Sequence, residues 1–261
     1  MAIALNAEKI LALQTRAQKL EIGLFKNIDS THTYLFNQVK AGRRSPLVCL
    51  AEAQTAGRGR QNKIWHSPKA VNIYCSILWF FAEANMALTG LNLVLSLAVI
   101  TTLKHFAITQ LGLKWPNDIW QQNQKIAGVL AEVVHTPMPG KVAIISVGLN
   151  VNAPPYPYPI NQAWTCMEYA AKKSFNRNEI VAFLLDQLEA TLSTFDCTAL
   201  PAVLDAWPTL DRLYNKKIAI QMNHQQFQGI ARGIDQQGHL IVDMNGKRRT
   251  FNSGDVSISL S

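Results

Sequence analysis

The sequence has no hydrophobic run long enough to cross a membrane. Its longest apolar-leaning stretch, residues 91–103, has 13 residues and includes four polar side chains, whereas a membrane-spanning helix needs about 20 apolar residues. The N-terminus also lacks a basic segment followed by an apolar core, because Glu8 and Lys9 interrupt its first apolar positions. We therefore expect neither a membrane protein nor a secreted one.

Cysteine is scarce, and its spacing excludes common metal motifs. The four cysteines form no C-x-x-C pair, and no Cys/His cluster has the spacing of metal ligands. They are Cys49, Cys75, Cys166 and Cys197. The sequence predicts reduced thiols in a cytoplasmic protein and no metal site formed by a direct protein motif.

Charged residues are few, at 16%, and they are unbalanced. Lys and Arg number 25 against 17 Asp and Glu, which gives a net charge of +8. Hydrophobic residues make up 48% of 261 residues, enough for one large domain or a medium domain with a small appendage, and this excludes wholesale disorder. The net positive charge favours an anionic partner. The charge alone leaves three classes of partner open: a nucleic acid, an anionic membrane or a phosphate-bearing small molecule.

Helix and strand patterns alternate up to about residue 212. We expect a leader helix in residues 1–22, a helix at 34–39 behind cap residues 29–31, and surface loops at 54–68 and 153–159. The other expected helices are at 91–108, 179–195 and 202–210, and the expected strands are at 47–53, 71–81, around 114–115, 126–134 and 142–151.

Five short alternating segments follow residue 211. They span residues 218–220, 227–234, 239–244, 248–251 and 256–258, and Asn245-Gly246 between two of them is a strong hairpin signal. Such a series is typical of a small β-barrel. We therefore place a domain boundary near 212, which gives domains of 1–212 and 213–261.

Residues 54–65 are the most informative segment for chemistry. Gly57 and Gly59 alternate with Arg58 and Arg60, so backbone N–H groups and guanidinium groups together offer an anion-binding loop, and Trp65 offers a stacking surface. A solvated basic loop that binds nucleic acid loosely is the simpler interpretation. A Walker phosphate-binding loop is excluded, because its glycine, lysine and serine or threonine spacing is absent.

Two later strands carry glycines in their interior. Lys125 begins one of them and Gly128 lies three residues on; Gly148 lies in the other, which ends at Asn150. Interior glycine weakens a strand unless a ligand or another backbone approaches closely. The simpler interpretations are a surface lysine, a bulge and a turn cap.

In order along the chain, these segments resemble the motifs of the biotin protein ligase family, the biotin–acetyl-CoA-carboxylase ligases. The resemblance rests on residues 54–65, 114–118, 125–132 and 148–152, with 29–31 as a first biotin-site element and 213–261, including 232–235, as a C-terminal SH3-like domain. It implies an α+β fold, in which a mixed-sheet catalytic domain of the biotin/lipoate ligase type precedes a small SH3-like β-barrel.

The resemblance also implies a two-step reaction. Biotin's carboxylate attacks the α-phosphorus of ATP to give biotinyl-5′-adenylate and pyrophosphate, and a lysine of a biotin carboxyl carrier protein then displaces AMP. ATP and biotin would be the substrates, with Mg²⁺ on the phosphates. Arg58, Arg60 and Lys125 fit this chemistry, because two anions must be brought together.

By motif position, the resemblance assigns the site residues. Catalysis falls to Arg58, Arg60, Lys125 and Asp118. Biotin binding falls to Ser30, Thr31, Gln54, Gly57, Arg58, Arg60, Lys125, Gly128, Ser146 and Gly148. ATP binding falls to Arg60, Lys63, Trp65, Asn117, Lys125 and Asn150, with Trp65 near adenine and Asn150 reading its edge.

Three positions depart from the family pattern. The family usually has Asn where His32 stands, and we expect this side chain to face away from the site. Asn62 occupies a frequent glycine position, and Asn tolerates the left-handed conformation. Ser146 also replaces a frequent glycine, so it bears on how closely the backbone can approach biotin.

Two other functions compete with the ligase. A DNA-binding regulator would need an N-terminal helix-turn-helix, and the 28 residues before Asp29 hold one helix-like stretch. We therefore expect no repressor function and no specific DNA binding. A lipoate ligase or octanoyltransferase would carry an Arg-Arg-x-Ser-Gly-Gly-Gly stretch, which is absent. A homodimer formed through exposed strands is left open.

Overall fold

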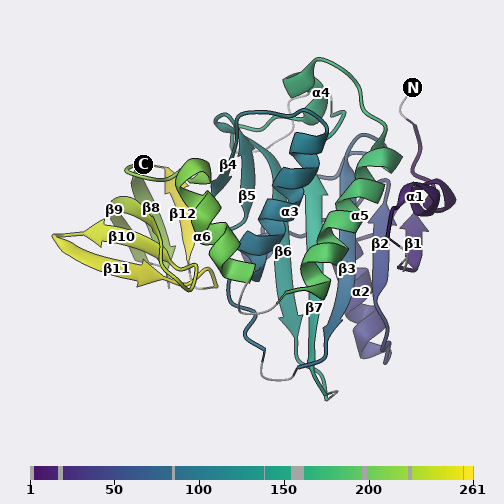
Figure 1. Ribbon diagram of the computed structural model, residues 1–261, viewed down its shortest axis with the longest axis horizontal. Helices are drawn as coiled ribbons and strands as arrows, with labels where there is room; N and C mark the ends of the chain where they lie inside the picture. Colours follow the sequence, from purple (N-terminus) through teal and green to yellow (C-terminus); the bar gives the residue numbers. More distant parts are fainter. Residues whose placement is uncertain are drawn as a thin grey trace.

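The computed structural model describes residues 3–16, 20–83, 86–137, 139–153, 162–195, 199–222, 225–254 and 256–260, and its strands form two sheets that lie side by side (Figure 1). The larger sheet has the order β1-β2-β3-β7-β6-β5-β4. Only β1 and β2 are parallel; the remaining neighbours are antiparallel, so the sheet is mixed, as expected. Its strands are β1 (Ile22–Phe25), β2 (Leu47–Ala51), β3 (Ile73–Phe81), β4 (Leu111–Lys114), β5 (Asp118–Gln121), β6 (Gln124–Val134) and β7 (Lys141–Leu149).

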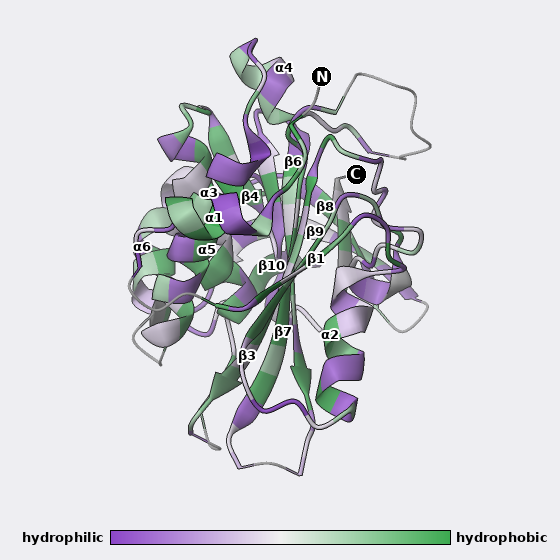
Figure 2. Cartoon of the chain, turned by 90° about the vertical axis from the view of Figure 1, so that its right-hand side faces the viewer, coloured by the Kyte–Doolittle hydropathy of each residue, from purple (hydrophilic) through white to green (hydrophobic). Residues whose placement is uncertain are grey.

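Helices cover both faces of the larger sheet (Figure 2). On one face lies α2 (Thr31–Lys40), whose Leu35 and Val39 pack against Cys49, Leu78 and Ile144 of the strands. On the other face lie α1 (Ala7–Leu13), α3 (Leu91–His105) and α5 (Arg177–Ser193). Helix α3 is apolar almost all round, which suits its burial against β4, β5 and β6 with α5 beside it.

Helix α2 begins with a side-chain cap. Ser30 is its N-cap: the backbone is extended there, and the side chain accepts a hydrogen bond from the Thr33 amide at 3.4 Å. The helix therefore begins at Thr31, three residues earlier than expected. The cap places Thr31 and His32 in its first turn, against the middle of the sheet.

The smaller sheet is antiparallel and has the order β11-β10-β9-β8-β12. Its strands are β8 (Lys217–Met222), β9 (Gln225–Ile234), β10 (Leu240–Met244), β11 (Lys247–Phe251) and β12 (Ser257–Leu260), and α6 (Ala199–Leu210) precedes them. Asn245 and Gly246 both have positive φ, at 49° and 73°, and they join β10 to β11 as the hairpin signal predicted. The boundary near 212 and the closed SH3-like barrel stay predictions.

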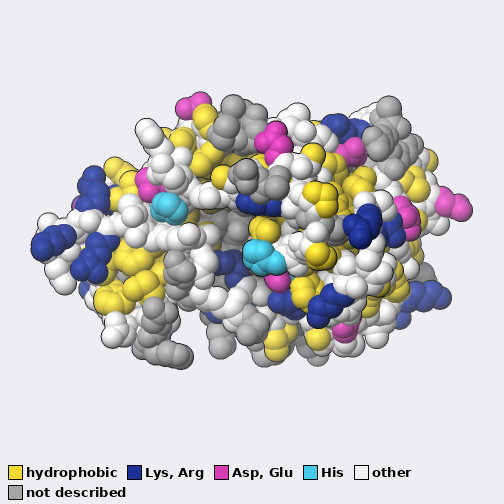
Figure 3. Space-filling model, turned by 90° about the horizontal axis from the view of Figure 1, so that it is seen from below, with side chains coloured by type: hydrophobic (Ala, Val, Ile, Leu, Met, Phe, Trp, Pro, Cys, Tyr) yellow, Lys and Arg dark blue, Asp and Glu magenta, His cyan; other side chains and the backbone are white. Residues whose placement is uncertain are grey.

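The two sheets share one hydrophobic core cluster. Buried residues of both belong to it, among them Leu113 of β4 and Val242 of β10. Trp115, almost fully buried after β4, also donates its indole N–H to the Gly238 carbonyl at 3.0 Å. Basic side chains gather at the far end of the smaller sheet (Figure 3), where Lys247, Arg248 and Arg249 of the edge strand β11 are exposed.

The expected leader helix over 1–22 is wrong in extent. Helix α1 ends at Leu13, because Gln14 turns to an extended conformation, and Ile22 already begins β1 in register with Val48. Strand β5 and the short helix α4 (Met167–Ala171) were not expected. Apart from Ala153, the loop predicted at 153–159 lies outside the described residues, as does Cys197. In the described ranges no helix is long and apolar enough to cross a bilayer.

Candidate functional site

A pocket lies over the middle of the larger sheet, where the expected motifs meet. The first turn of α2, the loop before β3, and strands β5, β6 and β7 form its walls, and Ile258 of β12 reaches it from the smaller sheet. Thirteen predicted site residues line it: Ser30, Thr31, Gln54, Arg58, Arg60, Lys63, Trp65, Asn117, Asp118, Lys125, Gly128, Ser146 and Gly148.

The glycine-rich loop closes on itself. The Trp65 amide donates to the Gly57 carbonyl at 2.9 Å, the Gly59 amide donates to the Lys63 carbonyl at 2.7 Å, and Arg58 and Ile64 form a bridge. A Cβ at Gly57 would overlap the Trp65 carbonyl oxygen, so no larger residue fits there. The close packing at Gly57 therefore comes from the loop itself, and Gly57 does not itself line the pocket.

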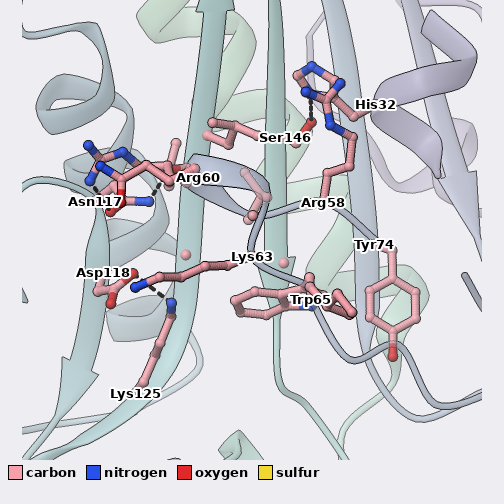
Figure 4. Close-up of a pocket in the computed structure, with 18 of the residues that line it drawn as sticks. His32, Arg58, Arg60, Lys63, Trp65, Tyr74, Asn117, Asp118, Lys125 and Ser146 are labelled. Atoms are coloured by element: carbon pink, nitrogen blue, oxygen red, sulfur yellow. Dashed lines mark hydrogen bonds and ion pairs between the residues drawn. The ribbon is translucent and has the colours of Figure 1, made fainter. Parts of the chain in front are cut away.

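The Trp65 ring lies against the two interior glycines. Gly128 and Gly148 are paired across β6 and β7, and a Cβ on Gly148 would overlap the indole, while one on Gly128 would meet it at 3.2 Å. The Trp65 ring also contacts Lys125, whose ammonium lies 5.1 Å from the ring centroid, within the range of a cation–π interaction. Figure 4 shows the indole inside the pocket beside this lysine. The glycines thus leave room for a flat ring.

Cations dominate the pocket. Five basic side chains and one carboxylate, Asp118, occur among its lining residues: Arg58, Arg60, Lys63, Lys114 and Lys125. Lys125 pairs with Asp118 at 2.6 Å, and both side chains are mostly buried. Burial lowers the pKa of Lys114, an effect that Asp118 opposes and that Lys125 and Lys63 reinforce. An anion that enters this pocket would relieve the repulsion among these cations.

Arg60 connects the loop to the smaller sheet. Its guanidinium donates to the carbonyls of Ser253 and Val256, and to the Asn117 amide oxygen at 3.5 Å (Figure 4). Burial lowers the pKa of Arg60, and Asp118 opposes this shift; an arginine remains protonated nonetheless. Residues between β11 and β12 therefore help to hold a cation at the pocket.

A polar wall faces this cationic side. The Gln54 amide oxygen accepts from the Thr31 amide at 2.8 Å, and the Thr31, Ser76 and Ser146 hydroxyls follow one another at 2.8 and 2.7 Å. His32 closes this wall: its Nδ1 is 2.8 Å from the Ser146 hydroxyl. The expectation that His32 faces away is wrong, because the first turn of α2 points that side chain at β7.

The residues that line the pocket include two that were not among the predicted site residues, and a predicted site residue, Asn150, is not among the described lining residues. Lys114 and His32 line the pocket, and both were present in the motifs, at the start of the 114–118 segment and directly after Thr31. Asn150 is buried and donates from its amide to the Thr165 carbonyl at 3.0 Å. Asn150 is not among the described lining residues, so its role in reading adenine stays a prediction.

Comparisons with known proteins identify the family. Residues 24–152 match the Biotin/lipoate A/B protein ligase family, and residues 214–259 match the Biotin protein ligase C terminal domain. Over 257 residues, the chain is 32% identical to the bifunctional ligase/repressor BirA of Escherichia coli (strain K12), which covers 97% of this chain and 78% of that protein. The chain belongs to the biotin protein ligase family.

Other members agree with this assignment. The chain is 30% identical to the biotin–[acetyl-CoA-carboxylase] ligase of Mycobacterium tuberculosis over 215 residues, which cover 80% of this chain and 78% of that protein. The biotin protein ligase of Aquifex aeolicus in complex with biotin and ATP superposes with a TM-score of 0.77 at 25% identity, over 92% of this chain and 99% of that one. The resemblance and the α+β class read from the sequence are confirmed.

Proposed function

We propose that this protein joins biotin to ATP, forming biotinyl-5′-adenylate and pyrophosphate, and then transfers biotin to a lysine of a biotin carboxyl carrier protein. The cationic side of the pocket carries this proposal, since both substrates of the first step are anions. The Aquifex aeolicus relative, whose structure is described with biotin and ATP, supports the choice of substrates.

The first step needs two anions in contact. A carboxylate oxygen of biotin forms a bond to the α-phosphorus, and the bond from that phosphorus to the bridging oxygen breaks as pyrophosphate leaves. Arg58, Arg60 and Lys125 offset the repulsion between carboxylate and phosphate and the charge that develops in the transition state. Asp118 positions the Lys125 ammonium through their 2.6 Å contact.

The second step needs no covalent bond to the enzyme. The uncharged amine of the carrier lysine attacks the acyl carbon of the adenylate, and AMP leaves with the electrons of the acyl–oxygen bond. The amine nitrogen passes one of its two protons to water as the amide forms. The same cations that offset the α-phosphate charge make AMP a better leaving group.

We assign the two substrates to different sides of the pocket, the biotin ring to the polar wall and the ATP phosphates to the cationic side. We assign the biotin ring to the polar wall with Ser30, Thr31, Gln54 and Ser146, and its carboxylate to Arg58, Arg60 and Lys125. Gly128 and Gly148 border the pocket beside the Trp65 indole, and Gly57 contributes by shaping the loop that carries Arg58. We assign ATP to Arg60, Lys63, Trp65, Asn117, Lys125 and Asn150.

Magnesium fits this site as a companion of ATP. In the described part of the chain, no three His, Cys, Asp or Glu side chains gather as metal ligands. Mg²⁺ is commonly held by one or two carboxylates together with substrate phosphates, and Asp118 lines the pocket. We propose that Asp118 contributes to its binding there; the bound ion would spread the charge of the phosphates.

A carrier-labelling assay tests the function. A biotin carboxyl carrier domain is incubated with the protein, biotin and MgATP, and mass spectrometry measures one added biotinyl group. We expect labelling that depends on ATP and is lost in Lys125→Ala. Parallel reactions with lipoate distinguish the related ligases: transfer of lipoate without transfer of biotin would overturn the proposal.

The compartment, the place of helix α1 and the oligomeric state lie outside the chemistry of the pocket. Cys49, Cys75 and Cys166 are free thiols in the described residues, which favours a reducing compartment, and we propose the cytoplasm. Helix α1 packs on α5, and the Asn6 amide next to it donates to the Asn178 side chain at 2.8 Å, which supports a catalytic domain that includes α1. The absence of specific DNA binding and the homodimer stay predictions.

A further inference from the structure

A continuous chain of hydrogen bonds runs through the polar wall. It joins the Gln54 amide oxygen to the Thr31 hydroxyl at 3.1 Å, and it continues through the Ser76 and Ser146 hydroxyls to His32 Nδ1. On the other side of the ring, His32 Nε2 is 3.1 Å from the Glu132 carboxylate. All of these groups except Ser76 and Glu132 line the pocket.

Each end of this hydrogen-bonded chain is fixed as an acceptor when His32 is neutral. The Gln54 NH₂ group donates to Ser67 at 2.9 Å, which turns the amide oxygen toward Thr31 and makes this end an acceptor. At the other end, a carboxylate faces His32 Nε2, so this nitrogen carries a proton. Nδ1 of the neutral ring is then an acceptor, and Nδ1 becomes a donor only when His32 is protonated.

The number of protons does not match the number of contacts when His32 is neutral. The chain has four contacts between Gln54 and His32, and three hydroxyl protons are available to fill them. Two acceptors at the ends therefore leave one contact without a proton. A protonated His32 supplies the fourth proton and fills the chain.

We propose that neutral His32 keeps one acceptor position open in this wall for an N–H group of the ligand, so that protonation of His32 and ligand binding compete. An N–H donor fits because the three hydroxyls can then all point toward His32, which leaves the Thr31 and Gln54 oxygens as acceptors. The inference rests on the proposed function, in which the ligand is biotin and the donor is an N–H of its cyclic urea. His32 is thus a positioning residue that acts through Ser146, Ser76 and Thr31.

The charges around His32 keep the neutral form accessible. Burial is the largest effect and lowers the pKa of His32 from its ordinary value of 6.5; Glu132 raises it, and Arg58 lowers it. Arg58 also donates to Glu132 at 3.5 Å, which draws that carboxylate toward the loop. Of the strands under α2, β2 presents the thiol of Cys49, whose pKa burial raises, and β3 and β7 present the hydroxyls of Ser76 and Ser146.

The first test is the pH dependence of biotin affinity without ATP. Because binding lowers the pKa of His32, affinity is full above the pKa of the free protein and is lost as the pH falls below it. Since burial places this pKa below the ordinary histidine value, we expect the Kd for biotin to rise severalfold between pH ~7.5 and pH ~5. The non-titrating His32→Gln should lose this pH dependence, and so should Ser146→Ala, which interrupts the chain but leaves His32 in place.

A buried serine outside the pocket provides the matched control. Ser96 of α3 donates to the Asn92 carbonyl at 2.7 Å, so Ser96→Ala removes a comparable hydroxyl. This variant should keep the pH dependence of the original protein. NMR of the His32 ring adds a readout that needs no catalysis: we expect the Nε2–H tautomer at neutral pH, and a lower pKa when biotin is bound.

The outcomes separate this inference from the proposed function. Failure to bind biotin at any pH would overturn the function. Binding of biotin with the same Kd at both pH values, or the same pH dependence in His32→Gln, would overturn the competition. A ring proton on Nδ1 of neutral His32 would overturn the proton count.

Discussion

Replacement of Lys125 by alanine gives the sharpest test of the catalytic assignment. The side chain is 13% exposed, its ammonium lies 2.6 Å from Asp118, and it also lies over the Trp65 ring. Removal of one charge that stabilises a developing anion costs about 10²–10³ in rate, or about 3–4 kcal/mol. We therefore expect biotinyl-adenylate formation to fall by that factor.

The effect on folding should be much smaller. Loss of one partner of a buried pair usually costs about 3–5 kcal/mol, because the other charge is left unpaired. Here Asp118 keeps interacting with two other cations, Arg60 and Lys114. We expect the free energy of unfolding to fall by about 1 kcal/mol, which corresponds to about 2–4 °C in Tm for a chain of this size.

The assay is biotin-dependent release of pyrophosphate, with a thermal melt of each variant. Lys125→Met keeps the aliphatic stem under Trp65 and removes only the charge, so it should lose as much activity as Lys125→Ala. Lys247→Ala on the exposed strand β11 is the control for loss of a surface lysine. Normal accumulation of adenylate in Lys125→Met would refute the reasoning, and so would a loss of activity no larger than the loss of folded protein.

Three further predictions use other parts of the structure. In Gly148→Ala the new Cβ would overlap the Trp65 indole, so we expect a displaced ring with altered tryptophan fluorescence and weaker adenylate formation; an unchanged emission spectrum would contradict this contact. The loop at 58–65 carries Arg58, Arg60 and Lys63, which trypsin cleaves, and it must open to admit substrates; we expect biotinyl-adenylate to protect it, and equal resistance with and without ligand would count against closure. Burial raises the pKa of Cys75 to about 12, so its thiolate is scarce at pH ~8 and forms only as the pH approaches that value; peptide mass spectrometry should find Cys75 unmodified by a thiol reagent until the protein unfolds, and rapid modification of the folded protein would disprove the burial.

The long periodic segments of the fold were predictable from the sequence. Strands β3 and β7 and helices α3 and α5 are strongly apolar, so their patterns identify them without any knowledge of their neighbours. Strand β1 was missed because it has only four residues, none of them fully buried, and its one ladder partner is β2, at a sequence distance of more than twenty residues. Its existence depends on a nonlocal pairing that no local pattern records.

The site was predictable as a set of segments but not as a set of contacts. The order of the motifs along the chain predicted that Gln54, Lys125 and Gly148 belong to one site. It did not place His32, because the orientation of a residue in the first turn of a helix depends on where that helix crosses the sheet. Ser146 presents the same difficulty: the sequence showed a small side chain in place of glycine, whereas its importance lies in a hydroxyl within reach of Ser76 and His32.

The two main cations of the pocket are held in different ways, and this difference explains how the pocket stays positive. Lys125 is held by a carboxylate, Asp118, which neutralises it until an anion arrives. Arg60 is held by the carbonyls of Ser253 and Val256 and by the Asn117 amide, all of which are uncharged acceptors. Uncharged acceptors fix the direction of a guanidinium without cancelling its charge, so Arg60, which Asp118 influences without direct pairing, keeps more of its charge for an entering anion than Lys125 does. Ser253 and Val256, which lie between β11 and β12, therefore help to keep the catalytic site positive.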